Sequence, residues 1–256
     1  MAPQQNSSAG FSAASGSTVD PAEVAKFSKL SDEWWDPRGK MAPLHKINPL
    51  RLAYIRDAAC RKFERNAKSL NCLSGLRILD IGCGAGLLCE PLSRLGAQVI
   101  GIDPSASNIA AARLHADKGH LSIDYRCTTV EEIDVRERFD IVLAMEVVEH
   151  VTDVGAFLSR CAAMVKPGGM MVVSTLNRNW KSFALAIVGA EYVLRWLPRG
   201  THQWDKFVTP DELAQHLAHN RLTITEHAGV VYNPLADRWS ISSDMDVNYM
   251  VVAEGV

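Results

Sequence analysis

The sequence has 256 residues, 47% of them hydrophobic, and a formal net charge of −2. This length and apolar content are enough for one sizeable core with a small appendage. The near-neutral charge argues against nucleic acid as the main partner, because there is no basic excess to neutralise phosphates.

The six cysteines are scattered and form no C-x-x-C pair. That usage is typical of a reducing compartment and disfavours a zinc site. Residues 1–20 are rich in Ser, Ala and Gly and are predicted to be disordered. They contain no Lys or Arg, unlike a secretory signal or a mitochondrial presequence. We therefore expect a bacterial cytoplasmic protein, or a mature mitochondrial matrix form whose presequence has been removed.

Residues 21–72 are predicted to form a helical arm at the start of a domain that spans 21–256. Asp20 followed by Pro21 is typical of a helix start, with an acidic cap and a proline in the first turn. Trp34 and Trp35 are expected to anchor the arm on the core. A second, amphipathic helix is predicted after Pro49, over residues 50–67, with Arg51 at its very start.

The stretch LRILDIGCGAGLLCEPLSRLGAQVIGID, residues 76–103, organises the rest of the chain. An apolar strand ends at Asp80, and a helical pattern and a second strand ending at Asp103 follow a loop. The loop has glycines at alternate positions: Gly82, Gly84 and Gly86. Such a unit is typical of nucleoside binding, because glycines let the backbone approach the ligand and the second acid accepts hydrogen bonds from ribose hydroxyls.

The spacing of this loop differs from the dinucleotide fingerprint G-x-G-x-x-G, whose third glycine position is occupied here by Leu87. An acid at Asp80 suits a ligand with positive charge near the loop, such as S-adenosylmethionine, better than a pyrophosphate. The pattern D-x-G-C-G-x-G resembles motif I of class I methyltransferases, with Asp103 at the position of their ribose acid. A tight turn in an unrelated α/β protein would explain one glycine but not three glycines and two acids.

Further strands are predicted at 123–127, 139–145 and 170–175, with helices at 105–114 and 153–165 between them. Two late strands, about 223–231 and 247–253, would complete the sheet. We therefore predict an α/β, Rossmann-like fold of the class I methyltransferase type, with a seven-stranded, mostly parallel sheet and helices on both faces. Ligands are expected beyond the carboxyl ends of the strands, where Gly82, Asp103 and Met145 converge.

Residues 176–220 are predicted to be a helical insertion. Within it, residues 180–199 have a broad apolar face and a narrow charged sector that includes Arg195 and Arg199. The stretch is too short and too charged to span a bilayer. Two interpretations remain: a helix buried on the core, or an interfacial helix that contacts the membrane surface.

Three segments give a more specific resemblance. They are similar to the ubiquinone-biosynthesis O-methyltransferases: WWDPRGKMAPLHKINPLRLAYI, LNRNWKSFALAIVGAEYVLRWLPRGTHQWDKFVTPDEL and the closing DVNYMV. The similarity covers roughly residues 22–252. It implies a S-adenosylmethionine-dependent enzyme that methylates two ring hydroxyls of polyprenylated catechol and phenol intermediates. It also implies peripheral attachment at the inner face of the membrane, with other ubiquinone-biosynthesis proteins as further partners.

The same resemblance implies roles for residues of the cofactor site. Arg51 would reach the carboxylate of the cofactor, since a guanidinium can bind two oxygens at once. Gly82 would lie under the methionine portion, Gly84 would also bind the cofactor, Asp103 would hold the ribose, and Met145 would line the pocket. From the residues alone, a salt bridge at a helix start is the preferred role for Arg51.

The candidate catalytic group directly follows the predicted fourth strand. If that segment is helical, Glu146, Glu149 and His150 share one face. His150 and Glu149 are candidates for removing the hydroxyl proton. All three together would suit Mg²⁺, which the family resemblance supports. The alternative is metal-free, with the acid capping a helix, and both interpretations stay open.

Three other functions remain as alternatives. A methyltransferase acting on another small phenol would show no preference for a prenyl tail. An NAD(P)-dependent oxidoreductase is disfavoured by the missing third glycine. A non-catalytic lipid-binding scaffold would bind membrane without transferring methyl groups.

Overall fold

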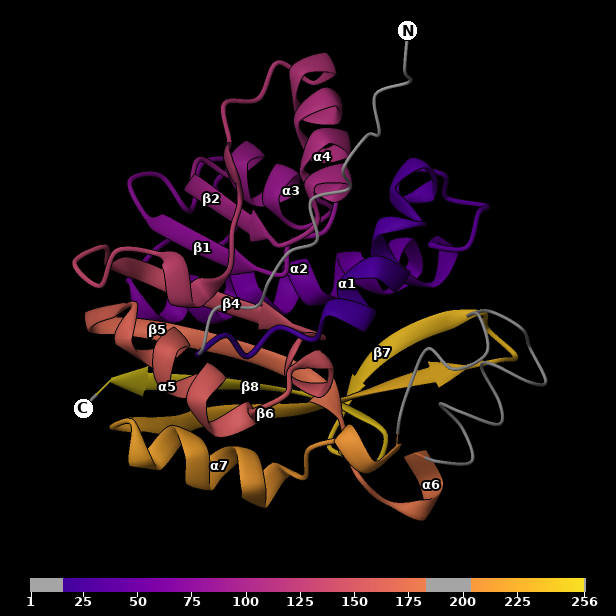
Figure 1. Cartoon of the computed structure of the whole chain (residues 1–256). Coiled ribbons are helices and arrows are strands. Elements are labelled where there is room, and N and C mark those ends of the chain that lie inside the picture. The colour runs from indigo at the N-terminus through magenta and orange to yellow at the C-terminus, as the bar shows by residue number, and fades with distance from the viewer. Residues whose placement is uncertain (1–15, 183–203, 256) are drawn as a thin grey trace, which may run out of the picture.

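The computed structural model describes residues 16–182 and 204–255 and contains a single mixed sheet (Figure 1). Its eight strands lie in the order β3-β2-β1-β4-β5-β8-β6-β7. They are β1 (Arg77–Ile81), β2 (Gln98–Asp103), β3 (Asp124–Cys127), β4 (Phe139–Met145), β5 (Val165–Leu176), β6 (Leu222–Asn233), β7 (Arg238–Ser242) and β8 (Asn248–Gly255). The strands from β3 to β5 pair in parallel, and β8, β6 and β7 join antiparallel. The predicted fold class is confirmed.

The predicted count of seven strands is one too low. The strand not predicted is β7, which forms a hairpin with β6 at the edge of the sheet and pairs Trp239 with Tyr232. Its sequence, RWSIS, lacks an apolar run, because an edge strand with partly exposed side chains needs little apolar surface. The hairpin partner, rather than the local sequence, makes this segment extended.

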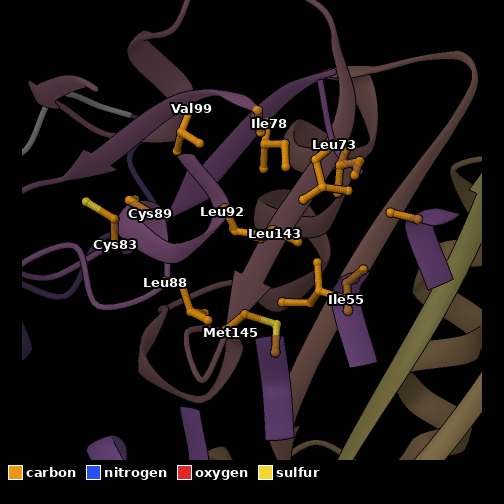
Figure 2. Packing of buried hydrophobic residues seen from close by; sticks show 14 of the residues in the cluster. Ile55, Leu73, Ile78, Cys83, Leu88, Cys89, Leu92, Val99, Leu143 and Met145 are labelled. Atoms are coloured by element: carbon orange, nitrogen blue, oxygen red, sulfur yellow. The ribbon is translucent and has the colours of Figure 1, made fainter. Parts of the chain in front are cut away.

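Helices cover both faces of the sheet. They are α1 (Pro21–Ser28), α2 (Ala42–Lys62), α3 (Cys89–Arg94), α4 (Ala106–Lys118), α5 (Val154–Ala163), α6 (Trp180–Ser182) and α7 (Pro210–His219). Because side chains alternate along a strand, Ile78 and Leu79 of β1 point to opposite faces. Ile78 belongs to the apolar cluster under α2, α3 and α4, and Leu79 to the cluster under α5 and α7. Figure 2 shows Ile55 of α2 and Leu143 of β4 within the first cluster.

The helix start predicted at Asp20 is confirmed, and two later helices also begin with a side-chain cap. Asp20 accepts a hydrogen bond from the N–H of Ala22, and Ser105 accepts one from Asn108. Thr209 forms a complete capping box with Glu212. These side chains satisfy N–H groups that have no partner inside the helix.

Helix α2 differs from the prediction that a helix begins after Pro49. It starts at Ala42 and continues through the proline, so Arg51 lies in its interior and not at its start. Proline removes one backbone hydrogen bond from a helix. Here the helix persists across Pro49 because its buried side chains on either side, Ile47 and Ile55, both pack into the core.

Part of the predicted disordered segment 1–20 is held against the domain. Val19 forms an antiparallel bridge with Val151, and the side chain of Thr18 hydrogen-bonds that of Glu131. Residues 1–15 lie outside the described residues, as does the greater part of the predicted interfacial helix 180–199, of which only Trp180–Ser182 are described. Among the described helices, none is long and apolar enough to cross a membrane.

Candidate active site

The candidate site is a cavity of about 1060 Å³ beyond the carboxyl ends of β1, β2 and β4. Strand order reverses between β1 and β4, so the helices that follow these two strands lie on opposite faces and leave a crevice. The N-terminal arm, which we define as residues 17–41, forms another wall of the cavity. All the predicted site residues except Gly84 line the cavity: Arg51, Asp80, Gly82, Asp103, Met145, Glu146, Glu149 and His150.

The glycine loop after β1 requires glycine for two separate reasons. Gly82 and Gly84 both have positive φ values, +69° and +54°, which side chains disfavour. A Cβ on Gly84 would also lie 2.4 Å from the indole ring of Trp34, and one on Gly82 would lie 2.6 Å from Val147. Gly84 therefore lies beneath the arm, and its backbone N–H points to the carboxylate of Asp103, 3.0 Å away.

Asp103 ends β2 as predicted and is buried. One carboxylate oxygen accepts the N–H of Gly84, and the other accepts hydrogen bonds from the backbone of Ser105 and the amide of Asn108. Burial raises the pKa of Asp103, and these donors oppose that rise. The carboxylate is thus fixed in direction at the tip of the strand, where it can accept further hydrogen bonds from ligand hydroxyls.

Asp80 is the second-last residue of β1, which ends at Ile81 and so runs one residue further than predicted, and it lies in a more apolar setting. Its carboxylate accepts one hydrogen bond, from the thiol of Cys89 at 3.1 Å. Burial raises the pKa of Asp80 to about 7, and the neighbouring charge of Asp103 adds to the rise. A ligand with positive charge in the cavity would favour the ionised form of this acid.

Arg51, a residue of α2, lies across the cavity from the glycine loop and is paired with an acid. Its Nη2 is 2.8 Å from Oε1 of Glu146, and the same oxygen accepts hydrogen bonds from Ser174 and Asn248. Glu146 has a positive φ of 56°, which is uncommon outside glycine. The Nε of Arg51 is buried without a hydrogen-bond partner among the described residues, so this guanidinium keeps a donor for a ligand.

His150 lies between two carboxylates. Its Nδ1 is 2.8 Å from Oε2 of Glu23 on α1, and its Nε2 is 4.0 Å from Oε1 of Glu149. The ring of Phe27 meets the imidazole edge-on, with centroids 5.1 Å apart. Glu149 accepts a hydrogen bond from Thr175, and burial together with the charge of Glu146 raises the pKa of Glu149. Oε1 of Glu149 has no hydrogen-bond partner within the described part of the chain.

The expected shared helical face of Glu146, Glu149 and His150 is not formed. The chain turns at Glu146, and only Val148–His150 form a 3₁₀ turn. Oε1 of Glu146 is already held by three donors, and His150 is hydrogen-bonded to the arm. In residues 16–182 and 204–255 no group of three or more His, Cys, Asp or Glu side chains is arranged to hold a metal ion. In this arrangement the three residues do not form a metal site, and Mg²⁺ binding stays a prediction.

Three contributors to the site were not predicted as such: Glu23, Asn108 and Trp34. From the sequence, no role is predicted for Glu23 or for Asn108. Trp34 was predicted to be an anchor, and it is: its indole N–H donates to Asn108 at 3.2 Å. No local pattern could identify Glu23, because its partner His150 is 127 positions away.

The strand order, the glycine loop and the acid at the tip of β2 together define a S-adenosylmethionine-dependent methyltransferase of class I. The family described as "Methyltransferase domain" matches residues 51–227. The fold is shared with the magnesium protoporphyrin IX methyltransferase ChlM of Synechocystis PCC 6803, solved with bound SAM. That likeness has a TM-score of 0.63 at 14% identity and covers 94% of this chain and all of the other.

Comparison with curated relatives shows which family within this class the chain belongs to. The chain is 86% identical over 239 residues to the ubiquinone biosynthesis O-methyltransferase of Bradyrhizobium sp. (strain ORS 278), covering 93% of this chain and 94% of that protein. It is 83% identical to the protein of the same name from Bradyrhizobium diazoefficiens, with 99% of both chains covered. The chain belongs to the ubiquinone biosynthesis O-methyltransferase family.

Proposed function

We propose that this protein transfers the methyl group of S-adenosylmethionine to ring hydroxyls of polyprenylated catechol and phenol intermediates, at both O-methylation steps of ubiquinone biosynthesis. Activity as a S-adenosylmethionine-dependent O-methyltransferase follows from the family. The observation that carries the proposal is the 83% identity over 99% of both chains. Action at both steps rests on the sequence resemblance, and the experiments below test it.

The cofactor fits the residues at the glycine loop. The fixed carboxylate of Asp103 is suited to ribose hydroxyls, and Gly82 lets a ligand approach the backbone. Asp80, buried without a cationic partner in the described chain, suits the positive end of the cofactor. We assign the unpaired Nε of Arg51 to the cofactor carboxylate, and Met145 to the wall beside it.

Methyl transfer to oxygen needs the hydroxyl proton removed. When bound, S-adenosylmethionine supplies a methyl group on a positively charged sulfur, so the hydroxyl oxygen forms the new C–O bond while the C–S electron pair remains on sulfur. His150 would accept the hydroxyl proton on Nε2, because an imidazole can exchange protons near neutral pH. The imidazolium that results would favour ionisation of Glu149, which is next to that nitrogen, and the carboxylate would in turn stabilise the positive ring.

The apolar part of the cavity supports the proposal that the substrate is prenylated. Beyond the polar end the lining continues along the β6–β7 hairpin and the end of β5, with Leu176, Val230, Val231, Trp239 and Val247. Burial of these side chains against an isoprenoid chain would add about 25 cal/mol for each Å² of apolar surface removed from water. A substrate without a tail would lose this contribution.

The decisive experiment measures methyl transfer from labelled cofactor to a prenylated phenol and a prenylated catechol, each compared with its tail-free analogue. We expect both prenylated substrates to be methylated, with a lower KM than the analogues. Equal KM values would favour the alternative of a general small-phenol methyltransferase. Membrane binding without any transfer would favour the alternative of a non-catalytic scaffold. His150→Ala should lower kcat strongly and leave cofactor affinity nearly unchanged.

A Mg²⁺ requirement remains a prediction from the sequence resemblance, and no step proposed above uses a metal. The same transfer assay with and without a chelator tests it. Loss of activity on chelation that only Mg²⁺ restores would support the metal. Glu149→Gln, compared with Glu146→Gln, would then show which carboxylate the metal needs.

We also propose peripheral association with the inner face of the cytoplasmic membrane through residues 180–199. Among the described residues of that stretch, Trp180 is 81% exposed, which suits an interfacial side chain. Flotation with anionic vesicles tests the proposal: the wild-type protein should float, and Arg195→Gln/Arg199→Gln should float less. No flotation by the wild type would favour a helix buried on the core.

A further inference from the structure

Helix α1 of the N-terminal arm carries the carboxylate that contacts His150. Oε2 of Glu23 lies 2.8 Å from Nδ1 of His150, across 127 positions of sequence. Glu23 is 8% exposed, and both residues line the cavity. A charged side chain buried to this degree costs free energy unless it is paired, so this contact is the reason that Glu23 can be inside.

The contact decides which nitrogen of the imidazole carries the proton. The hydrogen bond from His150 lowers the pKa of Glu23, against the effect of burial, and Lys26 assists at 3.5 Å. Glu23 is therefore a carboxylate, and a carboxylate can only accept. Nδ1 must then be the donor, so the neutral ring has its lone pair on Nε2, the nitrogen that is next to Glu149.

The orientation of the ring is fixed by the same helix. Phe27 lies one turn after Glu23, and its ring meets the imidazole at 81° between the planes. A hydrogen bond at Nδ1 and an aromatic ring together restrict rotation of the His150 side chain. Two residues of α1 thus contact one residue of the loop after β4.

Helix α1 is itself held at both ends by residues of the domain. Before it, Val19 bridges Val151, the residue after His150, and Lys206 pairs with Asp20 at 3.0 Å. At its end, the hydroxyl of Ser28 donates to that of Ser105, 2.7 Å away. The position of Glu23 is therefore set by contacts that do not involve His150.

We propose that Glu23 is a positioning residue for His150: it fixes the tautomer and the direction of the imidazole, so methyl transfer requires the N-terminal arm to be docked. This inference rests on the proposed role of His150 as the group that takes the hydroxyl proton. It goes beyond that role because it assigns part of the catalytic arrangement to residues outside the 51–227 methyltransferase match.

The test compares Glu23→Gln, Glu23→Ala and Glu23→Asp with a control, Glu33→Gln. Glu33 belongs to the same arm and pairs with Lys40 but does not line the cavity, so its substitution removes an ion pair and leaves His150 untouched. We expect Glu23→Gln and Glu23→Ala to lower kcat about 10–100-fold with little change in KM, as for other partners that orient a histidine. Glu23→Asp keeps the carboxylate and should retain part of the rate, and Glu33→Gln should match the wild type.

The second readout is the ¹⁵N spectrum of His150 in the full-length protein at a pH where the ring is neutral. The wild type should show a protonated Nδ1 and an unprotonated Nε2, and Glu23→Ala should show a mixture of tautomers. An unchanged tautomer and unchanged kcat in Glu23→Ala would overturn the proposal. So would a fall in kcat that follows a loss of thermal stability or of S-adenosylhomocysteine binding, since that would be a structural role.

A double variant separates this proposal from the proposed role of His150. If Glu23 acts through His150, Glu23→Gln/His150→Ala should be no slower than His150→Ala alone. Full activity of His150→Ala would contradict the role of the histidine, and the ¹⁵N spectrum would still decide whether Glu23 fixes the tautomer. An additional loss of rate in the double variant would overturn the proposal, because Glu23 would then act elsewhere.

Discussion

Nη2 of Arg51 lies 2.8 Å from Oε1 of Glu146, so the long helix of the N-terminal region is joined to the residue that directly follows β4. Both side chains are mostly buried, with 6% and 19% of their surfaces exposed. Glu146 holds a left-handed backbone conformation while it accepts hydrogen bonds from Ser174 and Asn248. The ion pair therefore fixes the backbone just before the turn that carries Glu149 and His150.

Removing both partners of this ion pair should destabilise the protein by less than the sum of the two single removals. Arg51→Met or Glu146→Gln alone leaves one buried charge without the opposite charge of the pair, and each should lower the free energy of unfolding by about 3 kcal/mol. In the double variant neither buried charge remains, so its loss should be smaller than the sum of the two single losses. Urea denaturation of the four proteins without cofactor measures this, and additive losses would contradict the coupling.

Asp103→Ala should weaken binding of S-adenosylhomocysteine by about 1–3 kcal/mol, since it removes a charged acceptor from the cavity. Isothermal titration measures the change. Asp124→Ala is a suitable control, because Asp124 pairs with Arg126 on neighbouring β3 but does not line the cavity. If both variants bind equally well, Asp103 does not contact the cofactor.

Gly84→Ala should displace the N-terminal arm. The new Cβ would meet the Trp34 ring at 2.4 Å, in addition to the strain of a positive φ. Gly75→Ala carries similar strain, with φ of +80°, but its Cβ would have no neighbour within 4 Å. We expect Gly84→Ala to expose Trp34, seen as a red shift of tryptophan emission, and to weaken cofactor binding. Gly75→Ala should do neither, and equal behaviour of the two would rule out the close approach.

Asp80→Asn should stabilise the cofactor-free protein above neutral pH. Burial raises the pKa of Asp80 from 3.8 to about 7, so between these values the folded state holds a proton that the unfolded chain releases. Stability from this group is therefore present at low pH and is lost as pH rises to about 7. Asparagine does not titrate, so the Asp80→Asn variant should not lose stability in this way as pH rises.

The free energies of unfolding of wild type and Asp80→Asn, measured at pH 4 and at pH 8, test this directly. The variant should gain about 4 kcal/mol relative to wild type between the two values, since the pKa is raised by about three units and each unit corresponds to about 1.4 kcal/mol. The same variant should bind the cofactor more weakly. A constant difference across pH would mean that Asp80 is not protonated in the folded state.

Features encoded locally could be predicted from the sequence. The glycine loop, Asp80 in β1, Asp103 at the end of β2 and the cap Asp20 each depend on a few neighbouring residues. Alternation and apolar runs were enough to place every strand of the sheet except β7. The fold class followed, because strands and helices alternate along the chain.

Features that depend on distant partners could not be predicted. Helix α2 runs through Pro49 because the core packs against both halves of it, which no local pattern reveals. Glu146, Glu149 and His150 do not share a helical face, because Glu146 turns toward Arg51 and His150 toward Glu23. Each of these pairings joins segments far apart in the sequence, so the arrangement of the candidate site is a property of the whole fold.

The position of β8 has a consequence for how the chain acquires its structure. This strand follows β6 and β7 in the sequence, yet it lies between β5 and β6 and, among the described strands, is the only one that joins β6 and β7 to the rest of the sheet. During synthesis the β6–β7 hairpin can therefore join the sheet only after the last strand has been made. Until then the edge of β5 keeps a row of backbone groups that, in the described structure, pair with β8, and it can pair with other chains.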